Sequence, residues 1–425
     1  MPTISPFRGW RYAPAAGDLA DLISPPYDVI SPAQADRLAA RDPHNSVRLE
    51  LPRPLPGEPA GGRYARAAAT LGAWQAAGLL VRDDRPAVYA YEQRWSPRGG
   101  QAQAQRGFVA RLGLEPFRAG GPVRPHERTL GGPRADRLAL LRATGANLSP
   151  IIGLYRTAGS ATATALGALT AMPPDAAVVD DAQVEHRLWV VPVDDPARGA
   201  AARVLLAGAS AAPITIADGH HRYETALSYR AERPEAATIM ALLFDLAATA
   251  VTTLPTHRLV RGEPAGPALL AAAAPLFRVD PCPSPAALTE VMGIPGPVGT
   301  QRLGLYTGGL AAVLTPRVAD IAPLLDQHAS QGLRWLDVAV LAAALWRLFG
   351  IDAAAAYDGA IGYTSDAQLA IEAVARGEAD TAFLLDPTPV DAVLAVAEAG
   401  ELMPQKSTYF TPKPATGLVF DTGGS

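Results

Sequence analysis

The stretch ITIADGHHRYETAL, residues 214–227, holds the residue types that could most clearly perform chemistry. It places Asp, Gly, two His and Arg in succession, in a chain with only seven His. Residues 213–217 are mostly apolar and β-prone, and 221–232 have helical periodicity, which predicts a tight turn from a strand into a helix. Gly219 permits backbone angles that other residues resist, and Asp218 is expected to be the N-cap.

Such a turn is a candidate anion site. The first amides of a helix lack intrahelical partners and lie at the positive end of its dipole, so they attract phosphate. With Gly219, the residues His220, His221 and Arg222 form the predicted phosphate-binding set, because Arg suits bidentate contact with phosphate. Asp218 would then hold Mg²⁺ or take a proton from a hydroxyl. A plain capped helix and a His-based metal site are the other interpretations.

Lysine usage points to a second place. The chain has 37 Lys and Arg residues, and only Lys406 and Lys413 are lysines. Lysine is a compact point charge on a mobile stem, whereas arginine is a rigid fork. The two lysines are therefore expected at positions where Arg will not serve, Lys406 as a catalytic residue and Lys413 as a phosphate ligand. Chance retention on a surface loop is the alternative.

Three further motifs bring polar groups together: SPPYDVIS at 24–31, RPHERTL at 124–130 and QKSTYFTPK at 405–413. Glu127 and His220 join Asp218 and Lys406 as candidate acid–base or charge-stabilising residues. The remaining side chains are predicted to bind the substrate, and they are Tyr27, Asp28, His126, Thr129, Ser407 and Thr408. Each motif alone has an ordinary structural explanation.

Composition limits the class of protein. At 425 residues, with 49% hydrophobic and 18% charged residues, the chain is typical of a globular protein of two or three domains. Its net charge of −4 disfavours nucleic-acid and membrane binding. The single Cys282 cannot form an internal disulfide, and no apolar run of about 18 residues is present, which favours a cytoplasmic location. A homo-oligomer is compatible with these features.

The order of elements predicts a mixed α/β (α+β) fold with several short sheets. Helices are expected at 31–43, 61–80 and 333–350, and paired strands at 86–95 and 106–117. Pro-rich breaks divide the chain into segments 1–170, 171–280 and 281–425. The P-loop, GxGxxG, GxSxG, HExxH and CxxC motifs are absent from the sequence, so the common nucleotide and hydrolase folds are not supported.

The motifs PPYDVI, HERT, DRLALL, ANLSPIIGLY, IADGHHRYETAL, LPTHRL and PQKSTYFTPKPATGL, in this order, resemble the family called domain of unknown function 1015. The resemblance covers nearly the whole chain. The DGHHR element is also similar to the signature of the wider ParB/sulfiredoxin-like group. That similarity implies a ParB/sulfiredoxin-like nucleotide-binding core, and the group includes partition proteins that use CTP, sulfiredoxins that use ATP, and free-serine kinases. Sulfiredoxin chemistry is not implied, because Cys282 lies far from the motif.

Three functions compete at this point. The first is a nucleotide-dependent kinase of a small hydroxyl metabolite, serine or a related amino acid, using Mg²⁺ with ATP or ADP, or less readily CTP. The second is a nucleotide-binding switch without chemistry. The third is a phosphatase of a small phosphorylated metabolite, with histidine as the general acid.

Overall fold

The structure, a computed structural model, describes residues 1–97, 100–127, 131–294, 296 and 300–423. The chain forms two compact units: unit 1 comprises residues 1–125, 129–251 and 412–425, and unit 2 comprises 126–128 and 252–411. The expected segments 1–170, 171–280 and 281–425 are continuous in sequence. The two compact units are not, because residues 412–425 belong to unit 1 together with the N-terminal part of the chain. The two units are described separately below.

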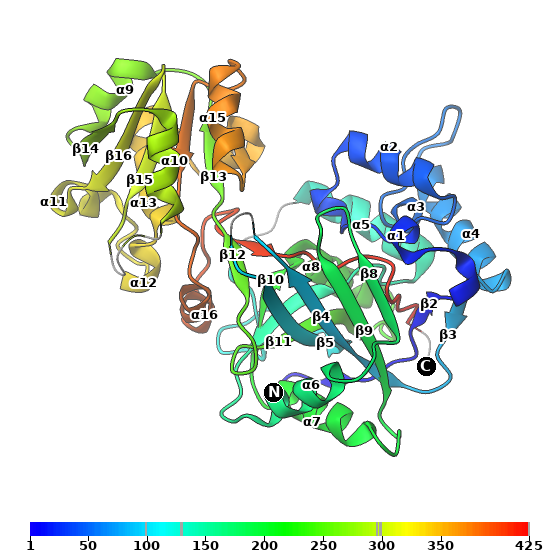
Figure 1. Ribbon diagram of the computed structural model, residues 1–425. Coiled ribbons are helices and arrows are strands. Elements are labelled where there is room, and N and C mark those ends of the chain that lie inside the picture. The colour runs from blue at the N-terminus through cyan, green and yellow to red at the C-terminus, as the bar shows by residue number, and fades with distance from the viewer. Residues whose placement is uncertain (98–99, 128–130, 295, 297–299, 424–425) are drawn as a thin grey trace. The chain divides into compact units, whose positions relative to one another are not determined.

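Unit 1 is built on a nine-stranded mixed sheet (Figure 1). Its strands are β1 (Ile4–Ser5), β4 (Ala87–Trp95), β5 (Gln103–Gly113), β6 (Val123–Arg124), β7 (Ile151–Tyr155), β8 (Ala176–Val179), β9 (Glu185–Pro192), β10 (Ile214–Asp218) and β11 (Thr238–Asp245). Their order is β6-β10-β7-β11-β5-β4-β9-β8, with β1 on β5. A separate ribbon pairs β2 (Trp10–Tyr12) with β3 (Leu80–Arg82).

Alternation along the central strands sorts side chains between the two faces of this sheet. The expected pair at 86–95 and 106–117 is confirmed, because β4 and β5 run antiparallel. Val88 and Ala90 join the main apolar core on one face. Their neighbours Tyr89 and Tyr91 belong to the opposite face, and both are also buried. The sheet is therefore covered on both sides, and the second side carries polar atoms.

Helices complete unit 1. They are α1 (Leu19–Leu22), α2 (Pro32–Arg41), α3 (Val47–Glu50), α4 (Gly62–Ala76), α5 (Gly131–Thr144), α6 (Ala161–Thr170), α7 (Gly199–Ser210) and α8 (His220–Glu232), with 3₁₀ turns η1 (Pro14–Ala16) and η2 (Tyr27–Val29). The helix expected at 31–43 is confirmed as α2, and the Ser31 hydroxyl caps it by accepting from the amide of Gln34. The apolar sides of α6, α7 and α8 pack into the main core.

Unit 2 has a six-stranded antiparallel sheet of order β14-β16-β15-β18-β13-β17. The strands are β13 (His257–Val260), β14 (Phe277–Cys282), β15 (Leu303–Thr307), β16 (Leu310–Pro316), β17 (Ile361–Thr364) and β18 (Thr381–Leu384), and β12 (Thr252–Leu254) pairs separately with β19 (Tyr409–Thr411). The helices are α9 (Gly266–Ala273), α10 (Pro285–Gly293), α11 (Val318–Ile321), η3 (Ala322–Leu324), α12 (Gln331–Arg334), α13 (Asp337–Phe349), α14 (Ala353–Ala355), η4 (Ala356–Ala360), α15 (Ala367–Ala375) and α16 (Val390–Glu398).

The prediction of one continuous helix at 333–350 is wrong in one respect. The structure breaks it into α12 and α13, because Leu336 is extended, with φ −72° and ψ 142°. Helix α13 then continues to Gly350, whose left-handed φ of 68° ends it.

The mixed α/β class is confirmed by the two sheets and their covering helices. The expectation of several short sheets is replaced by two large sheets and two small ribbons. Among the described residues, no helix combines the length and apolar character needed to cross a membrane.

The core of unit 1 can be tested with two neighbouring positions of α7. Leu205 is fully buried in the main core, whereas Val204 is 37% exposed. We expect Leu205→Ala to lower the free energy of unfolding by about 2–5 kcal/mol, because it leaves a cavity. Val204→Ala, the control, should cost less than about 0.5 kcal/mol. Urea unfolding followed by tryptophan fluorescence measures both, and equal losses would contradict the assigned face of α7.

Candidate functional site

The strand-to-helix turn predicted from the sequence is confirmed where β10 runs into α8 (Figure 1). Gly219 has φ 87° and ψ 28°, in the left-handed region that glycine tolerates best. A Cβ atom at this position would lie 2.7 Å from Cγ2 of Ile151. Glycine is therefore required here both by the backbone angle and by the neighbouring strand.

The expected capping role of Asp218 is wrong. Gly219 is the N-cap residue, and it provides no side-chain cap. Asp218 is instead the last residue of β10, and its carboxylate is held by two cations. Oδ1 accepts a hydrogen bond from Lys413 Nζ at 2.7 Å, and Oδ2 accepts one from Arg222 Nη2 at 2.9 Å.

The three groups of this ion cluster, which we name the Asp218 cluster (Asp218, Arg222 and Lys413), are largely withdrawn from water. Their side chains are 16%, 9% and 11% exposed, respectively. Burial alone would raise the pKa of Asp218, but the charges of Lys413 and Arg222 outweigh it and hold this pKa well below its ordinary value. Burial lowers the pKa of Arg222, and the negative charge of Asp218 reverses that effect, so its pKa is raised. Asp218 and Arg222 are therefore ionised at neutral pH.

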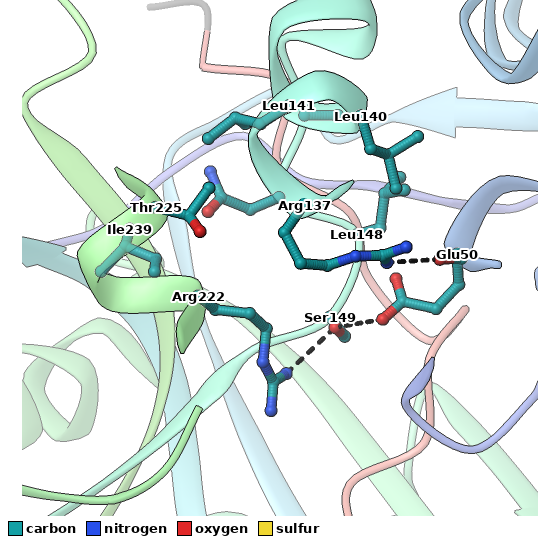
Figure 2. A pocket seen from close by; sticks show the side chains of 11 residues that line it. Glu50, Arg137, Leu140, Leu141, Leu148, Ser149, Arg222, Thr225 and Ile239 are labelled. Carbon is teal, nitrogen blue, oxygen red and sulfur yellow. Dashed lines mark hydrogen bonds between the residues drawn. The ribbon is translucent and has the colours of Figure 1, made fainter. Parts of the chain in front are cut away.

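Arg222 also connects this cluster to a second group of polar residues. Its Nη1 donates to Ser149 Oγ at 3.0 Å and to the carbonyl of Pro150 at 2.6 Å. The Ser149 hydroxyl in turn donates to Glu50 Oε1 at 2.7 Å (Figure 2). Arg137 Nη1 donates to the Glu50 carbonyl at 2.6 Å. The Arg222 guanidinium thus bonds the carboxylate at the end of β10 directly and is connected to the buried Glu50 through the Ser149 hydroxyl.

A small pocket of about 50 Å³ adjoins these residues. Figure 2 shows Arg222, Ser149, Glu50 and Arg137 along it, together with apolar side chains of α5. Among the described residues, Arg222 Nε and Thr225 Oγ1 are buried polar atoms that find no hydrogen-bond partner. The volume suits a few ordered water molecules, which polar walls of this kind hold.

The sequence did not single out Glu50 or Ser149. Glu50 ends the stretch SVRLE, and a buried Glu is rare enough to be a signal in principle. No local spacing connects it to the helix at 220–232, however. Arg137 lies inside α5, which begins at Gly131.

The PPYDVI motif reaches the same place. The Arg137 guanidinium lies 4.1 Å from the centre of the Tyr27 ring, and the Tyr27 amide donates to Glu50 Oε1 at 3.4 Å. Burial raises the pKa of Tyr27 to about 12, against the opposing charge of Arg222. Asp28 is exposed and contributes to raising the pKa of Arg222. Both predicted substrate-binding residues of this motif therefore lie near Arg222.

The two histidines of the turn differ in exposure. His220, the first residue of α8, is buried, and His221 is half-buried. The positive charge of His220 helps to lower the pKa of Asp218. The phosphate-binding role of both residues stays a prediction.

The other described candidates belong to unit 2. His126 Nε2 forms a hydrogen bond with Thr408 Oγ1 at 2.9 Å, and Glu127 pairs with Met403 in an isolated bridge. The Ser407 hydroxyl is buried and donates to the Pro404 carbonyl, which is a turn contact. The structure thus brings the HERT and KSTYF motifs together.

Lys406 and Thr129 are the other candidates in these two motifs. Lys406 is exposed and has φ 53°, one of two non-glycine residues with positive φ among those described. Its carbonyl accepts from Arg258 Nη2 at 3.1 Å. Thr129 lies outside the described residues.

The expected Mg²⁺ on Asp218 does not fit this arrangement. Magnesium takes oxygen ligands, usually from one or two carboxylates together with phosphate and water. Both oxygens of Asp218 already accept hydrogen bonds from cations. Across the described ranges, His, Cys, Asp and Glu form no group of three or more that could hold a metal ion. We therefore derive no step through a resident metal.

The Asp218 cluster makes stability depend on pH. Since the folded-state pKa of Asp218 is below its ordinary value, its ionised form stabilises the protein above about pH 4, and this contribution is lost as pH falls further. Asp218→Asn should cost about 3 kcal/mol at pH 7, because two buried cations lose their partner. Between pH 5 and pH 3 the cost of Asp218→Asn should fall by about 1 kcal/mol or more, because the stabilisation from the ionised carboxylate is lost as pH falls.

Urea unfolding of the wild type and the variant across this pH range measures the effect. Asp181→Asn is the control, since Asp181 is 57% exposed and pairs with Arg41 at the surface. Its cost should stay below about 1 kcal/mol. A cost for Asp218→Asn that is small, or that does not change with pH, would contradict the assigned ion cluster.

Several solved structures resemble this chain weakly. A mutant of free serine kinase in complex with AMP is 13% identical, with 71% of this chain and 88% of that chain covered and a TM-score of 0.37. A conserved hypothetical protein from Pyrococcus furiosus is 12% identical over 71% and 91%, with a TM-score of 0.34. C-terminally truncated SbnI from Staphylococcus aureus is 11% identical over 72% and 85%, with a TM-score of 0.35. At these values the likeness supports no conclusion about chemistry.

No curated protein matches the chain. The model of one protein family, described as protein of unknown function (DUF1015), matches residues 4–339. The match includes the PPYDVI, HERT and DGHHR motifs and ends before the KSTYFTPK motif. Because it spans most of the sequence, the chain belongs to the DUF1015 family, as the order of its motifs predicted.

Proposed function

We propose that the protein is a nucleotide-dependent phosphotransferase that acts on a small hydroxyl metabolite. The observation that carries this proposal is the Asp218 cluster: two cations on one carboxylate, directly before the left-handed Gly219 and the start of α8. The choice of serine or a related amino acid as acceptor rests on the motif resemblance alone.

The charges suit a phosphate group. Arg222 and Lys413 bring two positive charges to the single negative charge of Asp218, so the three groups in direct contact keep one positive charge in excess. The positive end of the α8 dipole adds to it. Phosphoryl transfer asks a protein mainly to position the reactants and to neutralise charge on the transferred group. Fixed cations in a poorly hydrated site do this without reorganising water.

The geometry favours an orienting role for Asp218 over proton abstraction. A carboxylate whose pKa is held low by Lys413 and Arg222 is a weak base. The same two bonds fix the directions of the cations that would meet the phosphate. The predicted catalytic residues Glu127 and Lys406, which belong to unit 2, stay predictions, as do the substrate-binding residues His126 and Thr408.

Phosphorus NMR tests the proposal. The purified protein would receive ATP, ADP or CTP with Mg²⁺ as the counter-ion of the nucleotide, together with a pool of amino acids and small alcohols. A new phosphomonoester signal that requires both protein and acceptor is expected, and omission of single pool members would identify the acceptor. Nucleotide binding without this product, or phosphate release from phosphoserine in the absence of nucleotide, would overturn the kinase proposal in favour of a switch or a phosphatase.

Removal of one cation should then slow the transfer. We expect Lys413→Ala to lower kcat about 100- to 1,000-fold, because a fixed positive charge is lost where negative charge develops. Arg142→Ala is the matched control: Arg142 is also ion-paired in unit 1, but it is 52% exposed and its partner is Glu232. Steady-state kinetics of both variants measure the effect. An unchanged rate for Lys413→Ala would remove Lys413 from the mechanism.

A further inference from the structure

The second face of the unit 1 sheet carries buried polar side chains that the phosphotransferase proposal does not use. Gln93 on β4 and Gln105 on β5 are 0% and 2% exposed. Gln105 Nε2 donates to Gln93 Oε1 at 2.8 Å, and Gln93 Nε2 donates to the carbonyl of Lys413 at 3.0 Å. Two amides in a sheet core therefore lead to the backbone of the lysine that pairs with Asp218.

A second line of polar groups ends two residues further along. The amide of Ala415 donates to Tyr91 Oη at 3.2 Å, and Tyr91 Oη lies 2.6 Å from His186 Nδ1. His186 Nε2 lies 3.0 Å from Asp180 Oδ2. One set of hydrogen bonds is consistent with these distances. Tyr91 Oη donates to His186 Nδ1, and His186 Nε2 donates to Asp180 Oδ2. Both Tyr91 and His186 are buried.

Buried polar groups cost stability unless their hydrogen bonds are made, so such groups in a sheet core need a reason. Here the bonds run to residues 412–423, a described segment that contributes no strand or helix after β19 ends at Thr411. Arg111 on β5 holds the same segment through Asp421 at 2.8 Å. Side chains of the sheet thus add to the isolated backbone bridges of Phe420, Thr416 and Asp421 in fixing this segment.

We propose that Gln93 and Tyr91 are positioning residues that fix the backbone at Lys413 and at Ala415, so that the Lys413 ammonium group meets Asp218. Gln93 holds the carbonyl of Lys413, and Tyr91 holds the amide of Ala415. A lysine stem has four carbon atoms and many rotamers, so its charge is placed well only if its backbone is fixed. Any consequence for catalysis rests on the proposed function, whereas the placement of Lys413 does not.

The two lysines of the chain make the placement measurable. Lys413 is 11% exposed and ion-paired, whereas Lys406 is exposed and serves as an internal reference. Limiting treatment of the folded protein with an amine-acetylating reagent, followed by peptide mass spectrometry, gives the ratio of the two labelling rates. In the wild type, Lys413 should react far more slowly than Lys406.

Tyr91→Phe and Gln93→Leu each remove one hydrogen bond to the segment with little change in shape. Each should raise the rate ratio of Lys413 to Lys406 about fivefold, the change in open population expected for one lost bond. Tyr89→Phe is the matched control: Tyr89 is buried on the same strand, but its hydroxyl contacts the amide of Gly9 and the carboxylate of Asp83. Its rate ratio should equal that of the wild type.

Two results would overturn the proposal. One is a ratio that Tyr91→Phe and Gln93→Leu leave unchanged, and the other is an equal rise in Tyr89→Phe, which would reflect general loosening. If phosphoryl transfer is observed, the two variants should lower kcat with little change in KM, and restoring Tyr91 or Gln93 should restore it. If no transfer is observed, the labelling ratios still decide the placement of Lys413, so the two proposals fail separately.

Discussion

The contact on which the candidate site depends is the carboxylate of Asp218 between two cations. Arg222 is one helical turn away, whereas Lys413 is 195 residues away in sequence. Neither cation would be tolerated at this degree of burial without a negative partner, because an unpaired buried charge is very costly. The end of β10, the first turn of α8 and the C-terminal segment are therefore tied together by electrostatics, and each must be placed correctly for the others to remain.

That requirement explains why the sheet of unit 1 is polar on one face. On the face that α6, α7 and α8 cover, Val88 and Ala90 are buried in the main apolar core, which the hydrophobic effect stabilises. The other face receives a segment without regular structure, whose backbone groups need individual partners. Gln93 and Tyr91 each supply one, and Arg111 holds the side-chain carboxylate of Asp421. A purely apolar face would bury the segment but would leave its register, and so the position of Lys413, unspecified.

Local signals in the sequence predicted local structure well. The apolar run before Asp218, the glycine and the helical period after it were enough to predict the turn, because strand, turn and helix are each decided over a few residues. The cap assigned to Asp218 failed since its partners depend on the tertiary fold. Glu50 and Ser149 were missed for the same reason: their bond to each other spans 99 residues. No periodicity records a contact of that kind.

The two lysines of the chain have different surroundings, so the presence of lysine needs a different explanation at each position. Lys413 takes one oxygen of a carboxylate whose other oxygen belongs to Arg222. A single point charge suits one oxygen, whereas a second planar fork would compete for both. Lys406 belongs to unit 2, is exposed and has a left-handed backbone, a conformation that costs energy for any residue with a Cβ. Closeness in sequence therefore did not mean one shared role: Lys413 has a reason in the Asp218 cluster, and any reason for Lys406 must be sought in the surroundings of His126 and Thr408.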